Sequence, residues 1–355
     1  MTGKWPQKKG TIYLDAGNIT RRKQAIDYAV SIIRRGGLVA FPTETVYGLG
    51  ADALNPQAVL KIYKAKGRPA DNPLIVHIAR ESELEQLVEE IPDDAYRLAS
   101  KFWPGPLTLI LKSTEKVPLE TTAGLTTVAI RMPAHPLALE LLEATKRPIA
   151  APSANSSGRP SPTMAEHVLA DLSGKVDAVI DGGSCRVGLE STVLDLTQKE
   201  PLILRPGAVT QEELAACLKK NVNQAVYQGD SPPPSPGMKY RHYAPRAPLF
   251  LVNGEKEDAV KAAIAALCQK FRRQGRKVAL LVSAEHAPYH EADIIEILGS
   301  RDRPAELSRR LFMSLRLLDD TDAEVIIAEG YPEKGLGVAL MNRLRKAAGE
   351  NIICV

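Results

Sequence analysis

The stretch from Leu38 to Gly50 constrains the fold of this chain more than any other. It begins with a short apolar run, Leu38 to Phe41, which is typical of a buried strand. It continues as Pro42-Thr43-Glu44-Thr45-Val46-Tyr47 and closes with glycines at 48 and 50. A strand that opens into a polar, glycine-bearing loop is where α/β folds place ligands. We therefore expect an α/β domain with a binding site beside this loop.

Amphipathic helices and short strands alternate along most of the chain. Asn55-Pro56 is a helix start, and Gly67 is a helix end. Residues 221–248 have the Pro-, Gly-, Ser- and Gln-rich composition of a linker, yet five consecutive residues (239–243) carry two tyrosines, one histidine and two cations. We expect this linker to dock on another part of the protein. Strand–helix alternation after it predicts a small parallel-sheet domain. The predicted parts are 20–220, 221–248 and 249–355.

Composition limits the class of protein. A length of 355 residues suits two domains. A net charge of +4 suits an anionic ligand but is too small to indicate nucleic-acid binding by itself. The four cysteines have no metal-binding or redox spacing, which favours reduced thiols. Because the first ten residues are polar and no long apolar run follows, we expect a cytoplasmic protein without a membrane span.

Polar residues at strand ends and in loops suit a nucleoside triphosphate, which needs cations, amides and hydroxyls, usually with Mg²⁺. Two clusters lie beside turn glycines, Lys66-Gly67-Arg68 and Ser153-Ala154-Asn155. A surface charge or a helix cap is the alternative for each residue alone. Neither a Walker-type loop nor a complete dinucleotide-binding pattern is present. The candidates are Lys66, Arg68, Asn72, Thr127, Ser153, Asn155, Thr163 and Arg205.

Arg131 lies within an otherwise apolar strand and so needs either an acidic partner or a ligand carboxylate. His77 is also on a strand, where a hydrogen-bonded core histidine is the commoner outcome. No serine sits in a nucleophile elbow, and no cysteine has an activating neighbour. We therefore expect direct transfer between bound substrates, driven by positioning and charge neutralisation.

The motifs Pro42–Leu49, Lys66-x-Arg68 and Ser153-x-Asn155 resemble the YrdC-like domain of threonylcarbamoyl-AMP synthases. The linker and Asn342-Arg343-Leu344 resemble the long, two-domain form. The resemblance implies a twisted mixed-sheet α/β domain with a basic concave face and a smaller Rossmann-like parallel-sheet domain. It also implies a reaction in which L-threonine, bicarbonate or CO₂, and ATP give L-threonylcarbamoyl-AMP and pyrophosphate. That product serves the N6-threonylcarbamoyl modification of adenosine 37 in tRNAs reading codons that begin with A.

The resemblance also implies roles for individual residues. Those nearest the chemistry are Lys66, Arg68, Ser153 and Asn155. Threonine would contact Thr45, His77, Arg131, Ser153 and Ser191. ATP would contact Arg68, Asn72, Thr127, Asn155, Thr163 and Arg205, with His242 and Tyr243 as a lid. Mg²⁺ would arrive on the ATP phosphates rather than in a protein metal site.

Partners and alternatives complete the expectations. The resemblance implies weak tRNA binding and transfer of the product to a threonylcarbamoyl-transferase complex. An alternative is an RNA-binding module that grips duplex RNA or tRNA on a basic face without ATP chemistry. Aromatic residues make up only 5% of the chain, which leaves few candidates for base stacking. A scaffold protein that binds a partner through its C-terminal domain is a further alternative.

Overall fold

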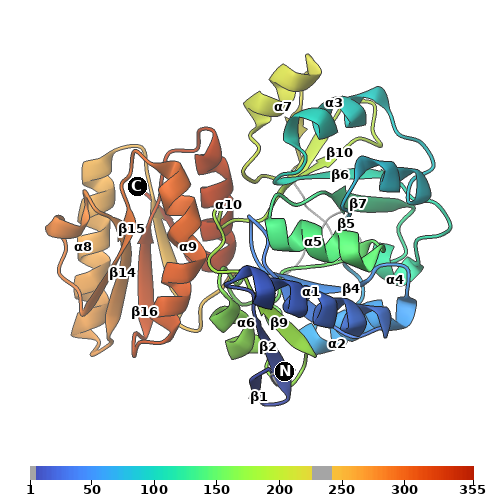
Figure 1. Cartoon of the computed structure of the whole chain (residues 1–355). Coiled ribbons are helices and arrows are strands. Elements are labelled where there is room, and N and C mark those ends of the chain that lie inside the picture. The colour runs from blue at the N-terminus through green and yellow to red at the C-terminus, as the bar shows by residue number, and fades with distance from the viewer. Residues whose placement is uncertain (1–4, 226–241) are drawn as a thin grey trace. The chain divides into compact units, whose positions relative to one another are not determined.

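The computed structural model describes residues 5–225 and 242–355, and it confirms the α/β class (Figure 1). The described chain forms two compact units. The first contains most of residues 5–225. The second contains residues 242–355 together with two short segments from earlier in the sequence, 158–160 and 187–189. No helix in the described ranges is long and apolar enough to cross a membrane.

The first unit is built on one mixed sheet with strand order β1-β2-β9-β3-β4-β8-β5-β7-β6-β10-β11-β12. It mixes parallel pairs, such as β5 with β7, and antiparallel pairs, such as β3 with β4. Two of its strands precede residue 20. The strands are β1 (Gln7–Lys8), β2 (Thr11–Asp15), β3 (Val39–Phe41), β4 (Gly48–Asp52), β5 (Ile75–His77), β6 (Leu107–Lys112), β7 (Thr127–Arg131), β8 (Ile149–Ala150), β9 (Ala178–Asp181), β10 (Thr192–Asp195), β11 (Leu202–Arg205) and β12 (Asn223–Gln224).

Helices cover the two faces of this sheet unequally. One face packs against a large core that includes residues of α2, α3, α6 and α7. The opposite face is covered by α1 and α5 over β2, β9 and β3. Toward β5, β7, β6 and β10 that second face carries, among the described residues, a small apolar cluster. The helices are α1 (Ile19–Arg34), α2 (Pro56–Lys66), η1 (Glu81–Gln86), α3 (Asp93–Phe102), α4 (Leu119–Thr122), α5 (Pro136–Thr145), α6 (Ala165–Leu172) and α7 (Gln211–Leu218).

Glycine is required at one position beneath the loop after β3. A Cβ on Gly50 would lie 2.7 Å from Phe41 Cε1 and 2.8 Å from Ile149 Cγ2. The missing side chain therefore lets the phenyl ring lie flat across the neighbouring strand, and this packing fixes the point where the chain leaves β3.

The second unit contains a five-stranded sheet in which every pair is parallel, with order β15-β14-β16-β13-β17. This confirms the predicted parallel-sheet domain. Helix α8 covers one face, and α9 and α10 cover the other (Figure 1). Its elements are β13 (Leu249–Asn253), α8 (Glu257–Arg273), β14 (Val278–Ser283), η2 (Ala287–Tyr289), β15 (Ile294–Gly299), α9 (Pro304–Asp319), β16 (Val325–Glu329), α10 (Leu336–Ala348) and β17 (Ile352–Cys354).

Candidate active site

The loop between β3 and β4 is held by its own threonines. The Thr43 hydroxyl donates to Val46 O at 2.6 Å and accepts the backbone N–H groups of residues 45 and 46. Since the Thr43 proton is used, the Thr45 hydroxyl donates to Thr43 Oγ1 at 2.8 Å. The oxygen of Thr45 is thereby turned outward as an acceptor. A sequence of small hydroxyl residues thus fixes a loop that would otherwise be mobile.

Arg131, at the end of β7, is the cation that this loop receives. Its Nη1–H donates to Thr45 Oγ1 at 2.8 Å, and its Nε–H donates to Gly105 O at 3.1 Å. Its Nη2 lies 2.7 Å from Glu44 Oε1, and both side chains are buried. This pair is close but is not aligned as a hydrogen bond. Of the two partners predicted for Arg131, the acidic one is therefore present, and Nη2 is the guanidinium nitrogen that has no hydrogen-bond partner among the described residues.

His77 lies beside Arg131 on the same face of the sheet. The two residues are direct cross-strand partners of β5 and β7. Burial, and after it the Arg131 charge, lower the pKa of His77 to about 3, so its ring is neutral at physiological pH. The Nδ1–H donates to Ile75 O at 3.2 Å. His77 is therefore a neutral polar wall of the site.

Lys66 ties the end of α2 to the loop after β8. Its ammonium donates to Ser153 O at 2.5 Å and to Asn155 O at 2.6 Å. The backbone of Ala154 donates to Tyr47 O, so the loops at 42–47 and 152–155 are also joined directly. The two predicted motifs, Lys66-x-Arg68 and Ser153-x-Asn155, are thus in contact.

The segment after α2 brings Arg68 and Asn72 together. Helix α2 has the predicted Asn55 cap and ends at Gly67, whose φ of 63° is left-handed. Arg68 Nη2 donates to the backbone carbonyl of Asn72 at 3.1 Å. The Asn72 side chain is fully buried, and neither of its polar atoms has a hydrogen-bond partner among the described residues. A buried amide without partners is costly unless a ligand supplies them.

Ser191, which directly precedes β10, contacts Arg205 at the end of β11. Arg205 donates to Ser191 O and Ser191 Oγ, both at 3.1 Å. Ser191 Oγ also lies 2.7 Å from Thr108 Oγ1. Thr163 is buried nearer the first loop, where its neighbour Pro162 accepts the Tyr47 N–H at 2.8 Å.

The remaining predicted residues are Thr127, His242 and Tyr243. Thr127 begins β7, whereas Arg131 ends it, so strand alternation places both on one face at opposite ends. His242 and Tyr243 belong to the second unit. There the Tyr243 ring packs on Phe312, with ring centroids 5.1 Å apart, and beneath the Arg343 guanidinium. Their role as a lid stays a prediction.

Sequence reasoning gave no role to Glu44 or Thr108. Glu44 stands between two threonines directly after a buried strand, and that placement could have marked it as the acidic partner that Arg131 required. Thr108 follows one apolar residue within a strand and carries no comparable signal.

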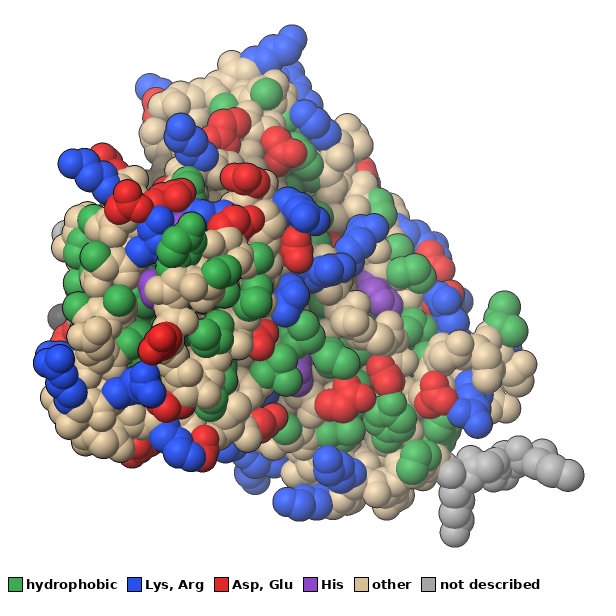
Figure 2. Space-filling model, turned by 90° about the vertical axis from the view of Figure 1, so that its left-hand side faces the viewer, with side chains coloured by type: hydrophobic (Ala, Val, Ile, Leu, Met, Phe, Trp, Pro, Cys, Tyr) green, Lys and Arg blue, Asp and Glu red, His purple; other side chains and the backbone are tan. Residues whose placement is uncertain are grey.

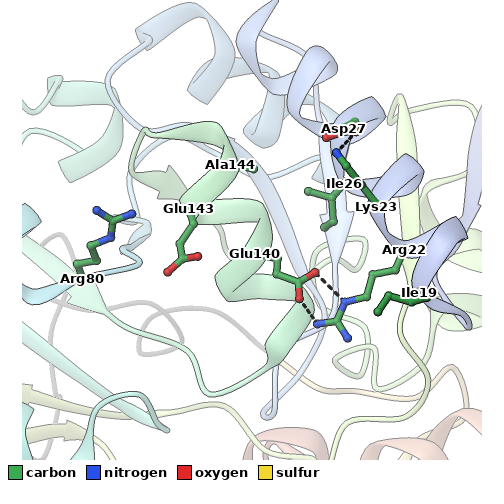
Figure 3. Close-up of a pocket in the computed structure, with 9 residues that line it drawn as sticks. All are labelled: Ile19, Arg22, Lys23, Ile26, Asp27, Arg80, Glu140, Glu143 and Ala144. Atoms are coloured by element: carbon green, nitrogen blue, oxygen red, sulfur yellow. Dashed lines mark hydrogen bonds and ion pairs between the residues drawn. The ribbon is translucent and has the colours of Figure 1, made fainter.

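Other surface features lie outside this site. A groove of about 530 Å³ runs between α1 and α5, where Arg22 pairs with Glu140 (Figure 3). None of the predicted site residues lines it. On the face shown in Figure 2, lysines and arginines are interspersed with acidic side chains, so that face has no single-sign surface for duplex RNA.

Comparison with known proteins places the chain in a family. Residues 31–207 match the family described as "Telomere recombination", and residues 209–349 match "Threonylcarbamoyl-AMP synthase, C-terminal domain". The threonylcarbamoyl-AMP synthase of Pyrococcus abyssi is 53% identical over 93% of this chain and 96% of its own length. This chain belongs to the threonylcarbamoyl-AMP synthase family. The synthase of Bacillus subtilis is 48% identical, over 92% of this chain and 94% of its own.

A solved structure shows the same fold over nearly the whole chain. It is Pyrococcus abyssi Sua5 complexed with L-threonine, with a TM-score of 0.91 and 51% identity. The match covers 97% of this chain and 100% of that one. The resemblance inferred from the motifs is therefore confirmed.

Proposed function

We propose that this protein is a nucleotidyltransferase that converts L-threonine, bicarbonate or CO₂, and ATP into L-threonylcarbamoyl-AMP and pyrophosphate. The observation that carries the proposal is the buried Arg131 guanidinium, which lies against Thr45 and beside the neutral His77. A guanidinium that lies next to a threonine hydroxyl is a combination that recognises an amino-acid carboxylate. Relatives named for this synthase activity, and one whose structure contains L-threonine, support the proposal.

The amino-acid half of the site uses Thr45, His77, Arg131, Ser153 and Ser191. Arg131 holds the threonine carboxylate through Nη2. Thr45 and Ser191 present hydroxyl oxygens already fixed by Thr43 and Thr108. Such prior fixing lowers the entropy lost when substrate binds.

The nucleotide half uses the basic and amide side chains beyond the two joined loops. Arg68 and Arg205 supply charge, Lys66 fixes the loop that carries Ser153 and Asn155, and Asn72 offers a buried amide. The other proposed contacts are Thr127, Asn155, Thr163, His242 and Tyr243. Mg²⁺ would enter on the triphosphate and neutralise the leaving pyrophosphate. These cations, amides and hydroxyls fit a metal carried by phosphates, since a dedicated Mg²⁺ site uses carboxylates.

Electrostatic positioning accounts for the chemistry without a covalent intermediate. Threonine carbamate, ATP and pyrophosphate are all anions, so holding them together requires positive charge. A carbamate oxygen attacks the α-phosphorus, and the bond to pyrophosphate breaks. Arg68 and Arg205 stabilise the charge that develops. Residues 226–241 of the predicted linker lie outside the described residues, and the lid role is proposed for His242 and Tyr243, which would exclude water that otherwise hydrolyses the adenylate.

Replacement of Arg68 with alanine tests the nucleotide half. We expect threonine-dependent pyrophosphate release to be lost while the fold is retained, because Arg68 is half-buried in the loop after the end of α2 rather than part of the apolar core. Mass spectrometry of wild-type reactions with ATP, Mg²⁺ and bicarbonate should show the adenylate with threonine and much less with serine. Undiminished turnover in the Arg68 variant would refute its assignment.

The lability of the product favours rapid use by a second enzyme. A carbamoyl adenylate is a mixed anhydride that water attacks, so we propose direct transfer to an enzyme complex that modifies adenosine 37 of tRNA, with weak tRNA binding by this chain. The cytoplasm is the proposed location, in keeping with four cysteines that form no disulfide.

A further inference from the structure

The side chain of Glu44 is a buried carboxylate that the proposed function leaves without a task. Only 2% of it is exposed, and it lies in the loop that shapes the candidate site. Neither of its oxygens has a hydrogen-bond partner among the described residues. Its contact is the 2.7 Å approach of Oε1 to Arg131 Nη2. A buried anion with unfilled acceptor positions is expensive unless something donates to it.

The groups around Glu44 do not supply such a donor in charged form. Burial raises the pKa of the Cys185 thiol, and the Glu44 charge adds to that effect, so the thiol stays neutral. Burial lowers the pKa of His135, while Glu44 acts weakly in the opposite direction, so that ring is also neutral at physiological pH. Arg131 thus carries the positive charge that faces Glu44.

Substrate binding changes this balance. If the amino-acid carboxylate binds Nη2 of Arg131, one guanidinium must neutralise two anions, this carboxylate and Glu44. Leaving one buried charge uncompensated would cost much of the binding energy. A free amino acid supplies the missing positive charge, because its ammonium group is separated from its carboxylate by one carbon atom. One buried ion pair can then be exchanged for two.

We propose that Glu44 is a catalytic residue that receives the substrate ammonium group and accepts its proton as the amine becomes a carbamate. The inference rests on the proposed function. With bicarbonate as donor, the amine nitrogen bonds to the bicarbonate carbon, and the bond from that carbon to a hydroxyl breaks. Glu44 takes one proton from the ammonium group before this attack, which frees the nitrogen lone pair, and a second nitrogen proton leaves with the hydroxyl as water. The carbamate anion then faces a neutral carboxylic acid, which removes repulsion between them.

The test compares L-threonine with (2S,3R)-2,3-dihydroxybutanoate, which keeps the carboxylate but has a hydroxyl in place of the ammonium. Calorimetry on the full chain measures both affinities. We expect Glu44→Gln to weaken threonine binding about 10- to 100-fold, the range of a hydrogen bond between charged groups, and to strengthen binding of the hydroxy acid, because the variant removes the anion that competes for Arg131. At saturating threonine, adenylate formation should also slow, since the proton acceptor is gone.

Controls separate this role from a structural one. If Glu44 only positions Arg131, both ligands weaken together, and the proposal is overturned. Arg131→Met should weaken both and serves as that comparison. Asp52→Asn alters another buried carboxylate paired with an arginine and should change neither affinity. Should Glu44→Gln fail to fold, Glu44→Asp keeps the charge and should keep the preference for threonine over the hydroxy acid.

The result also distinguishes this inference from the proposed function. Wild-type protein that forms the adenylate, alongside a Glu44→Gln variant with unaltered threonine affinity, overturns only the role of Glu44. Wild-type protein that binds no threonine and forms no adenylate overturns both.

Discussion

Replacing Arg131 with methionine should expose the cost of the charge on Glu44. The variant leaves a carboxylate that is 2% exposed without its cation, and it removes hydrogen bonds to Gly105 O and Thr45 Oγ1. Losing one partner of a buried pair costs about 3–5 kcal/mol. The second change, Glu44→Gln, should therefore recover much of the lost stability.

Tryptophan fluorescence during urea unfolding measures the free energy of unfolding of the first unit in each variant. Both tryptophans of the chain, Trp5 and Trp103, lie in the first unit, so their signal follows that unit even though two units need not unfold together. The single variant should be less stable at pH 7 than the double variant.

The comparison has a clear negative outcome. Equal stability of the single and double variants at pH 7 would mean that Glu44 carries no buried charge opposite Arg131. The assignment of Glu44 and Arg131 as a buried ion pair would then be wrong, and so would the proposed contact between Glu44 and the substrate ammonium group.

Three further predictions use the same domain. Since the pKa of His77 is lowered to about 3, the unfolded chain takes up a proton on acidification that the folded chain does not. The free energy of unfolding should therefore fall between pH 6.5 and 3, by roughly 3 kcal/mol at pH 4.5. His77→Gln should flatten this pH dependence in urea titrations, and an unchanged slope would contradict the prediction. Lys66→Met removes two hydrogen bonds to the loop at 153–155 and should lower pyrophosphate release at least about 10-fold, whereas exposed Lys64→Met should not. Gly50→Ala should cost about 1–3 kcal/mol by crowding Phe41, and an unaltered urea midpoint would count against that packing.

Features encoded by local patterns were predictable from the sequence. The Asn55 cap and the Gly67 end of α2 follow from the conformations these residues favour, and the structure has both. The parallel C-terminal sheet follows from strand–helix alternation. The motifs 66–68 and 153–155 were expected to meet, and Lys66 joins them.

Features that depend on distant pairing were not predictable. Strand β2 pairs with β9, far along the chain, and nothing local in either strand specifies the other. The residue pattern of 81–100 favours a mostly helical segment that is broken at Pro92. The segment before Pro92 is instead a 3₁₀ helix at 81–86, after which Val88 is drawn into a bridge with Ser113. The choice of Glu44 as the partner of Arg131 likewise depends on how a loop and a strand meet in space.

The two short segments at 158–160 and 187–189 affect how the gene can be divided. Within the second unit, Arg159 pairs with Asp319 at 2.8 Å, Arg316 donates to Pro160 O at 2.5 Å, and a Cβ on Gly188 would lie 2.4 Å from Arg309 Cα. No single cut in the sequence separates the two units. Co-expressed fragments divided between residues 225 and 242 would retain these non-covalent anchors, so fragment complementation is a practical way to study either half.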